Sequence, residues 1–538
     1  MIYFQKYPNK LFLVLKKNYR LVFLFVIFVT SFVIRRIGLK YGFPLLTHPD
    51  EVFIIEPVYH MTLNKTLNSD TFNRPDQILL FLNFIYLNIV SYIQFGKSLA
   101  NTFLDNQQLF YFYARLLICF FGSLIPILAY KIGKEFKLDF SIPSALIFAF
   151  FPSFVIHSHY VTPDVMITLF TLIIIFFTVK FLNTENRNYL YFATFFSAVN
   201  TAEKYPGLIS LSIIFLGVVL YFLEKDWKST KKNNYKELIT FCLRLVGIFL
   251  ISLYLIAPNL FIQFGKVIEA ITFEARSTHL GADNLGWFGN LIFYVNNYYS
   301  FVNLLGILFI LFGVFYLIKS KEIKSFILFY GVIYWIIISM LALHWERWAL
   351  PMYITPNFLV AIGVTYLIHL SKGKKIIKYL IFLLVLIFIS YQFIYSLSSS
   401  IKLSFTDTRV IAIEFCRDND ITSVNSVFEG YTPFNPQFPD MIFDFENMPN
   451  DEIKYVILSS QMYQRYFAEP DRYHEEIKFY DDIRSSYSLI YEISPTQVDS
   501  KNLKQAVENI GYYIRLQLGN NSEIRLSGPT IQIYEILE

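Results

Sequence analysis

The chain has 538 residues, of which 55% are hydrophobic and only 16% carry a charged side chain. A bilayer core about 30 Å thick needs roughly 20 apolar residues for each helix that crosses it, so this composition indicates a protein with many membrane-spanning helices. It excludes a disordered, collagen-like or disulfide-rich chain. The net charge of +5 is spread between apolar runs, which excludes a nucleic-acid-binding protein.

Twelve apolar runs are long enough to be candidate membrane spans. The first run follows several basic residues and no small-residue cleavage site comes after it, which favours a retained anchor and a cytoplasmic N-terminus. The runs are residues 21–38, 78–95, 109–130, 141–157, 162–182, 189–203, 206–223, 239–262, 300–318, 325–343, 351–370 and 376–397.

Basic clusters decide between twelve spans and eleven. Lys and Arg concentrate in cytoplasmic loops, and the clusters of this chain all lie on the side of the N-terminus only if one run does not cross. The run at 78–95 contains Asn83, Asn88 and Gln94, so we expect an interfacial or re-entrant helix there. The basic clusters lie at residues 131–137, 180–187, 225–236, 319–324 and 372–378.

We therefore expect a multi-pass cell-membrane protein with two parts. Residues 1–398 form an all-α polytopic domain with about 11 transmembrane helices, and residues 39–108 and 263–299 form its long outer loops. From residue 399 to 538 short alternating stretches are separated by Pro, Asn and Asp, which is typical of strands. This segment is predicted to be a small extracytoplasmic α/β domain, in which YVILSSQMYQRYF is a strand followed by a helix.

Two adjacent acids follow the first span. Asp50 and Glu51 lie beside His48, just beyond an apolar helix. Adjacent carboxylates at a membrane surface are costly unless something uses them. The simpler interpretation is a pair of solvated loop carboxylates.

A second group of polar residues borders the span at 162–182. Asp164 opens that span after His159 and Tyr160, and Lys204 lies in the turn AEKYPG between two later spans. An Asp in the first turn of a helix is often only a cap on the helix dipole, and a lone Lys at a membrane surface often only extends to the headgroups.

Further cations and imidazoles lie in the later outer loops. The segment EARSTHLGADN contains Arg276 and His279, and HWERWALP contains Arg347. Each basic residue has the same simple explanation as a side chain that reaches the headgroups. Together, however, the outer loops collect acids, imidazoles and permanent cations from at least five separate places.

Five of these segments resemble the integral-membrane glycosyltransferases of the C-type (GT-C) fold, in particular the protein O-mannosyltransferase and aminoarabinose-transferase group. They are the Asp-Glu pair, ARL at 114–116, HYVTPD, AEKYPG and ERWALP. The resemblance covers about residues 10–400. The chain departs from the group in two ways: it has no large β-trefoil insertion, and NRPDQ at 73–77 replaces the usual double-proline segment.

The resemblance implies transfer of a sugar from a polyprenyl (dolichyl or undecaprenyl) phosphate donor to an extracytoplasmic acceptor, which is a protein, a lipid or a glycan. It implies Asp50 as the general base, most simply with inversion of the anomeric carbon. Glu51 and Asp164 are the other candidate catalytic residues. Cations then hold the donor phosphate, with Lys204, Arg276 and Arg347 as candidates. Candidate substrate-site residues are His48, His159, Tyr160 and His279.

No cofactor is assigned. A divalent metal bound by Asp50, Asp164 and an imidazole is an alternative that the spacing of these residues does not decide.

Two other functions stay open at this stage. A polytopic transporter or flippase would usually carry ionisable groups near the midplane and paired repeats, and a surface-polysaccharide polymerase or ligase would use a lipid-diphosphate donor.

Overall fold

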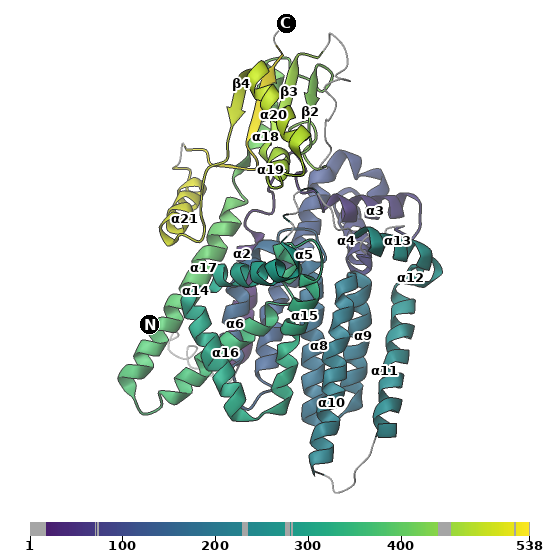
Figure 1. The fold of residues 1–538 in the computed structure, drawn as a ribbon, viewed down its shortest axis with the longest axis vertical. Coiled ribbons are helices and arrows are strands. Elements are labelled where there is room, and N and C mark those ends of the chain that lie inside the picture. Colours follow the sequence, from purple (N-terminus) through teal and green to yellow (C-terminus); the bar gives the residue numbers. More distant parts are fainter. Residues whose placement is uncertain are drawn as a thin grey trace, which may run out of the picture.

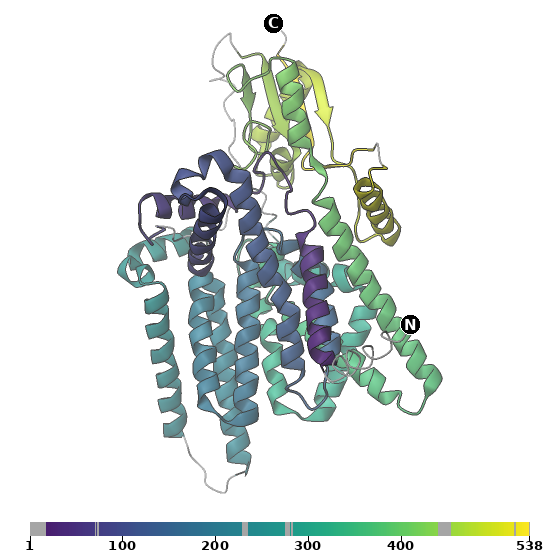
Figure 2. The ribbon, with the colours of Figure 1, turned by 180° about the vertical axis from the view of Figure 1, so that it is seen from behind.

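The computed structural model describes residues 18–69, 72, 75–228, 235–274, 280, 283, 285–438, 453–520 and 523–536. Most of the chain up to residue 402 is helical, and a small sheet follows at one end of the helical bundle (Figures 1 and 2). The helices before the first strand are α2 (Tyr19–Arg36), α3 (Val52–Leu63), α4 (Gln77–Phe95), η1 (Leu99–Asn101), η2 (Leu104–Asn106), α5 (Gln107–Gly133), α6 (Ser141–Phe150), α7 (Pro152–His157), α8 (Asp164–Thr184), α9 (Arg187–Glu203), η3 (Tyr205–Ser210), α10 (Leu211–Lys228), α11 (Tyr235–Ile256), α12 (Asn259–Ile262), α13 (Phe264–Glu274), α14 (Gly286–Ser320), η4 (Ile323–Phe329), α15 (Tyr330–Ser339), η5 (Glu346–Ala349), α16 (Ile354–Leu370) and α17 (Lys375–Lys402).

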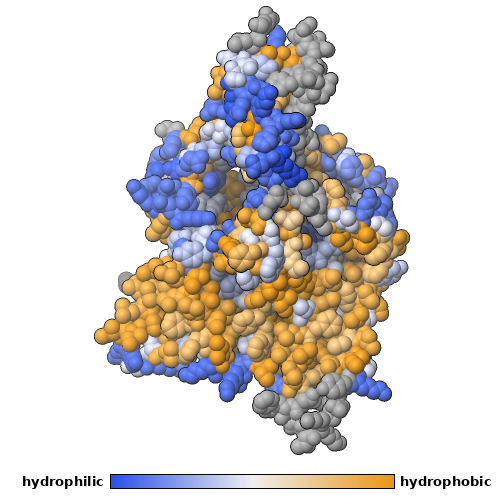
Figure 3. Space-filling view, in the orientation of Figure 1, coloured by the Kyte–Doolittle hydropathy of each residue, from blue (hydrophilic) through white to orange (hydrophobic). Residues whose placement is uncertain are grey.

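A band of apolar surface runs across the helical bundle on the face shown in Figure 3, with polar surface above and below it. Within the described part of the chain, seven helices are long and apolar enough to cross a membrane, and further apolar helices are shorter. The structure therefore confirms a polytopic, all-α membrane part. The number of spans and the side that each terminus faces stay predictions. The seven helical segments are Gln77–Phe95, Leu104–Gly133, Asp164–Thr184, Tyr205–Glu224, Lys236–Ile256, Gly286–Ser320 and Lys375–Lys402.

Helix α4 does not carry the chain from one end of the bundle to the other, although its length and composition would allow it to cross. At its start, the N–H groups of Ile78 and Leu79 donate to the Glu203 carboxylate at the end of α9. At its end, the Phe95 ring packs on Phe110 in the first turn of α5. Both termini of α4 thus lie at the end of the bundle that faces the sheet, as expected for an interfacial helix.

The run 141–157, expected as one span, forms the two helices α6 and α7. Phe151 between them is extended, with φ −66° and ψ 118°, and Pro152 is the first residue of α7. The residue before a proline is disfavoured in helical conformation, while proline suits the first position of a helix. The carbonyl group of Ala149 accepts a hydrogen bond from the buried Arg35 (Nη1 to O, 3.1 Å).

Two glycines allow α14 and α16 to pack closely. A Cβ atom added at Gly363 would lie 1.9 Å from the carbonyl oxygen of Phe309, and one added at Gly313 would lie 2.1 Å from that of Leu359. Any other residue would force the two backbones apart. This contact belongs to the largest hydrophobic core, which also contains buried side chains from α5, α6 and α8.

The C-terminal region, residues 403–536, contains a four-stranded sheet with the order β2-β3-β6-β4, in which β2 and β3 are parallel and the other pairs antiparallel. Both faces of β3 are buried: Val456 and Leu458 pack against α19 and α20, while Ile457 packs against α18. The predicted mixed α/β fold is confirmed, including the strand and helix at YVILSSQMYQRYF. The elements are β1 (Thr406–Asp407), α18 (Thr408–Asp418), β2 (Ser426–Phe428), β3 (Tyr455–Ser459), α19 (Ser460–Phe467), α20 (His474–Ser486), β4 (Ser488–Ile493), α21 (Leu503–Gln517), β5 (Leu526–Ser527) and β6 (Ile531–Glu535).

Candidate active site

Asp50 and Arg347 form an ion pair between two distant parts of the chain. Asp50 lies in the turn before α3, and Arg347 lies in the short helix η5 between α15 and α16. Their Oδ2 and Nη1 atoms are 2.5 Å apart, and the side chains are 15% and 29% exposed. The guanidinium orients this carboxylate, and its partial exposure leaves it accessible to a substrate.

His48 and Tyr160 form the wall beside Asp50. The two rings stack with centroids 4.5 Å apart, and the Asp50 backbone N–H donates to Nδ1 of His48. Burial lowers the pKa of His48 below its ordinary value, although the charges of Glu51 and Asp50 oppose this shift. Burial also raises the pKa of Tyr160 to about 12. Both rings are therefore neutral near pH 7, so the pair provides an uncharged, aromatic surface.

Asp164 and Lys204 form a second ion pair in the same place. Asp164 begins α8, and Lys204 directly follows the last residue of α9. The Lys204 Nζ atom lies 2.7 Å from Oδ1 of Asp164. The ammonium group also lies 5.9 Å from the ring centre of Trp348, next to Arg347 in η5. The charge of Arg347 in turn acts on Asp164. The structure thus brings two acids and two cations from four segments into one site. This site lies where α9 ends, at the same end of the bundle as the two termini of α4.

Glu51 has different surroundings from Asp50. It is fully buried and pairs with Arg115 of α5, whose Nη2 lies 2.7 Å from Oε2. The backbone N–H of Val161 donates to Oε1 of the same carboxylate. Arg115 also donates to the carbonyl groups of Leu39 and Tyr41. This ion pair fixes the segment that carries Asp50 against α5 and the loop before α8.

Three further polar residues of the site, Glu346, Ser153 and His157, were not predicted from the sequence. Glu346, next to Arg347, accepts a hydrogen bond from the Ser153 hydroxyl (2.6 Å) and lies 3.5 Å from His157. Burial alone would raise the pKa of Glu346, but His157 and Ser153 hold it below its ordinary value. The ERWALP segment already contained Glu346 directly before the predicted site residue Arg347. Its contacts with Ser153 and His157 on α7 depend on the fold and could not be predicted from the sequence.

Three predicted site residues are not placed with Asp50. His159 is fully buried, with Nε2 2.8 Å from the carbonyl oxygen of Ile37, and burial lowers its pKa to about 4. It therefore joins the end of α2 to the loop before α8. Arg276 and His279 lie outside the described residues, so their roles stay predictions.

The residues that the structure describes contain no group of three His, Cys, Asp or Glu side chains suited to a metal ion. Asp50 and Asp164, the carboxylates of the hypothetical metal site, each contact a cation instead. What the site offers is a partly exposed carboxylate for proton transfer, beside a guanidinium and an ammonium group that suit a phosphate.

Comparison with known protein families gives one match. Residues 85–267, which include Asp164 and Lys204, match the family model of the dolichyl-phosphate-mannose-protein mannosyltransferases. No curated protein matches the chain. The match confirms the predicted resemblance, and with it the predicted class of enzyme, a membrane glycosyltransferase of mannosyltransferase type.

Similar solved structures include two of ArnT from Cupriavidus metallidurans, both 12% identical. The apo state gives a TM-score of 0.48 over 93% of this chain and 89% of that chain. The structure bound to undecaprenyl phosphate gives 0.46 over 91% and 85%. The Archaeoglobus fulgidus oligosaccharyltransferase in complex with Zn and sulfate is also 12% identical, with a TM-score of 0.45 over 95% of this chain and 88% of that chain.

Proposed function

We propose that this protein transfers a sugar from a polyprenyl-phosphate donor to a protein, lipid or glycan acceptor at the end of the bundle that faces the sheet, with Asp50 as the general base. The observation that carries the proposal is the pair formed by Asp50 and Arg347, 2.5 Å apart, beside Lys204. A transferase of this kind needs a base for the acceptor and cations for the leaving phosphate, and these residue types meet here.

In the proposed reaction, Asp50 removes a proton from the acceptor as the acceptor attacks the anomeric carbon. The bond between that carbon and the phosphate oxygen breaks, and its electron pair leaves with the lipid phosphate. Arg347 and Lys204 stabilise the growing negative charge, with Arg276 as a further candidate. A single displacement of this kind inverts the anomeric carbon, whereas retention would require a second carboxylate as nucleophile.

The ion pairs also suggest how the site responds to the donor. Asp50 and Asp164 neutralise Arg347 and Lys204 in the structure. A lipid phosphate that binds both cations competes with these carboxylates. Binding of the donor would therefore release Asp50 from Arg347 as the acceptor arrives. The match to a family named for dolichyl-phosphate-mannose supports a lipid-monophosphate donor.

The test is an assay of membranes that contain the full-length protein, given radiolabelled sugar on either a polyprenyl monophosphate or a polyprenyl diphosphate. We expect sugar transfer and release of the lipid monophosphate from the first donor only. Arg187→Ala is the control for Arg347→Ala. Arg187 also pairs with a carboxylate, that of Glu237, but it lies at the start of α9, at the opposite end of this helix from Lys204 and the site. Transfer from the diphosphate donor, or unchanged transfer by Arg347→Ala, would contradict the proposal.

A further inference from the structure

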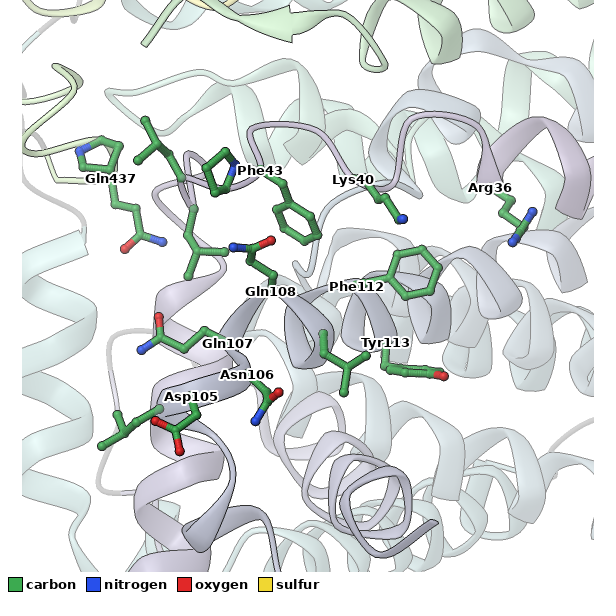
Figure 4. Close-up of a pocket in the computed structure, with 16 residues that line it drawn as sticks. Arg36, Lys40, Phe43, Asp105, Asn106, Gln107, Gln108, Phe112, Tyr113 and Gln437 are labelled. Carbon is green, nitrogen blue, oxygen red and sulfur yellow. The ribbon is translucent and has the colours of Figure 1, made fainter. Parts of the chain in front are cut away.

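A cavity of about 1220 Å³ lies between the helical bundle and the C-terminal region. Its walls come from the end of α2, the loop that follows it, η2, the start of α5 and the segment around Gln437 (Figure 4). Neither Asp50 nor any other residue of the candidate active site lines this cavity. It is therefore a separate feature of the molecule.

The cavity is cationic. Arg36, the last residue of α2, and Lys40 in the following loop both line it, while Asp105 is the one acidic residue in its wall. Figure 4 shows both cationic side chains along the same edge of the cavity. Neither cation forms an ion pair with any carboxylate in the described part of the chain. Two cations on one cavity wall, neither neutralised by a described carboxylate, provide a site for an anion.

The rest of the lining is mixed: the amides Asn106, Gln107, Gln108 and Gln437 form one part of it, and apolar side chains form another. Two aromatic rings, Phe43 and Phe112, lie on the same side as the cations, and leucine side chains extend the apolar wall. A small inorganic anion does not need such a wall, whereas an amphiphile with a charged headgroup does. The leucines are Leu45, Leu46, Leu104 and Leu109.

Helix α2, which is rich in apolar residues, ends at Arg36, on the edge of the cavity. If α2 lies in the membrane, as its sequence predicts, the cavity lies at the level of the lipid headgroups. Arg and Lys side chains at this level attract anionic lipid headgroups with about 1 kcal/mol for each charge. A single Arg or Lys side chain at this level could simply extend to the lipid headgroups. That explanation does not account for two cations that line the same cavity.

We propose that this cavity binds an anionic phospholipid, with the headgroup phosphate between Arg36 and Lys40 and the acyl chains along the apolar wall. Because Pro436 and Gln437 of the C-terminal region also line the cavity, a bound lipid contacts both parts of the molecule. The proposal does not depend on the transfer reaction. It assigns the cavity a lipid that stays bound and is neither donor nor acceptor.

The test is thermal unfolding and native mass spectrometry of the full-length protein in detergent with three probes: phosphatidylglycerol, phosphatidylcholine and inorganic phosphate. We expect phosphatidylglycerol alone to raise the unfolding midpoint and to remain bound. The double variant Arg36→Gln with Lys40→Gln should bind it roughly 10- to 30-fold more weakly. The matched control is Lys97→Gln, an exposed lysine that does not line the cavity.

Equal binding of phosphatidylcholine, an equal effect of inorganic phosphate, or full binding by the double variant would each overturn the proposal. Size-exclusion chromatography without lipid shows whether the double variant is folded. If it is not, Lys40→Gln alone is compared with the control, and unchanged binding by that single variant also overturns the proposal. None of these readouts uses sugar transfer, so they separate this proposal from the proposed function.

Discussion

Two adjacent carboxylates, Asp50 and Glu51, have different environments. Asp50 is partly exposed and meets Arg347, whereas Glu51 is fully buried against Arg115. The sequence singled out this acidic pair because charges there are costly. It did not reveal which of the two acids faces a substrate, since that depends on the positions of α5 and η5, which are distant in sequence.

Glu51→Gln is expected to lower the free energy of unfolding, and to affect the rate of sugar transfer mainly through this loss of stability. Breaking a buried ion pair by removing one partner costs about 3–5 kcal/mol, because the other charge stays buried alone. Thermal unfolding of the purified protein measures the loss. The double variant Glu51→Gln with Arg115→Gln should recover part of it. A Glu51→Gln protein with an unchanged unfolding midpoint but no transfer activity would instead support the catalytic role predicted from the sequence.

Glu429 in the C-terminal region gives a pH-dependent prediction. Burial raises its pKa to about 8, although hydrogen bonds from the Ser459 N–H and the Tyr480 hydroxyl oppose this. An unfolded glutamate titrates near pH 4.3, so between about pH 4.3 and 8 the native state holds a proton that the unfolded state releases. The free energy of unfolding therefore falls as pH rises through this window.

Hydrogen exchange of the β3 amides, corrected for intrinsic rates, measures this effect. Protection should decrease from pH 5.5 to pH 8 in the wild-type protein and change little in Glu429→Gln. The same pH dependence in both proteins would show that other groups cause it.

At the scale of elements, the apolar runs predicted most of the long helices because a helix in a membrane needs about 20 apolar residues. They missed the break between α6 and α7, where Pro152 begins a new helix, because composition alone does not mark a break within an apolar run. They also did not predict which helices touch. The contact between α14 and α16 depends on Gly313 and Gly363, and a single sequence does not show that these glycines face each other.

Gly363→Ala is expected to destabilise the protein by about 1–3 kcal/mol, because the added methyl group would overlap the backbone of α14. The control is Gly247→Ala in α11, where an added Cβ atom has no neighbour within 4 Å and alanine favours the helix. Thermal unfolding of both variants in the same detergent gives the comparison. Equal midpoints would contradict the close packing of these helices.

At the scale of the whole molecule, the two ends of the bundle differ in charge and chemistry. Three of the predicted basic clusters, at residues 131–137, 180–187 and 319–324, meet at one end. There, Lys180 pairs with Glu135 (2.7 Å) and Lys324 donates to Asn183 (2.6 Å). The ion pairs of the candidate site lie at the other end, because α9 runs from Arg187 at the basic end to Lys204 in the site. The C-terminal sheet follows the bundle at this end (Figure 1). The sequence predicted this division from the positions of Lys and Arg alone. The structure adds that α4 begins and ends on the side of the site.

We expect a cysteine at position 134 to be labelled from the cytoplasmic side only. Lys134→Cys in a background without the three native cysteines would be treated with a membrane-impermeant maleimide before and after the membrane is opened. A cysteine at the exposed position 97 is the matched control and should be labelled in intact cells. Labelling of position 134 in intact cells would place the basic end outside and contradict the predicted location of the site.

The role of Asp50 is tested most directly by assaying sugar transfer and polyprenyl-phosphate binding side by side for the wild type, Asp50→Asn and the control Asp105→Asn. Loss of a general base lowers the rate by about 100-fold or more, while the lipid phosphate should bind Asp50→Asn at least as tightly, because Arg347 no longer has a competing carboxylate. Asp105→Asn should retain full activity. Transfer by Asp50→Asn at the wild-type rate would contradict the account.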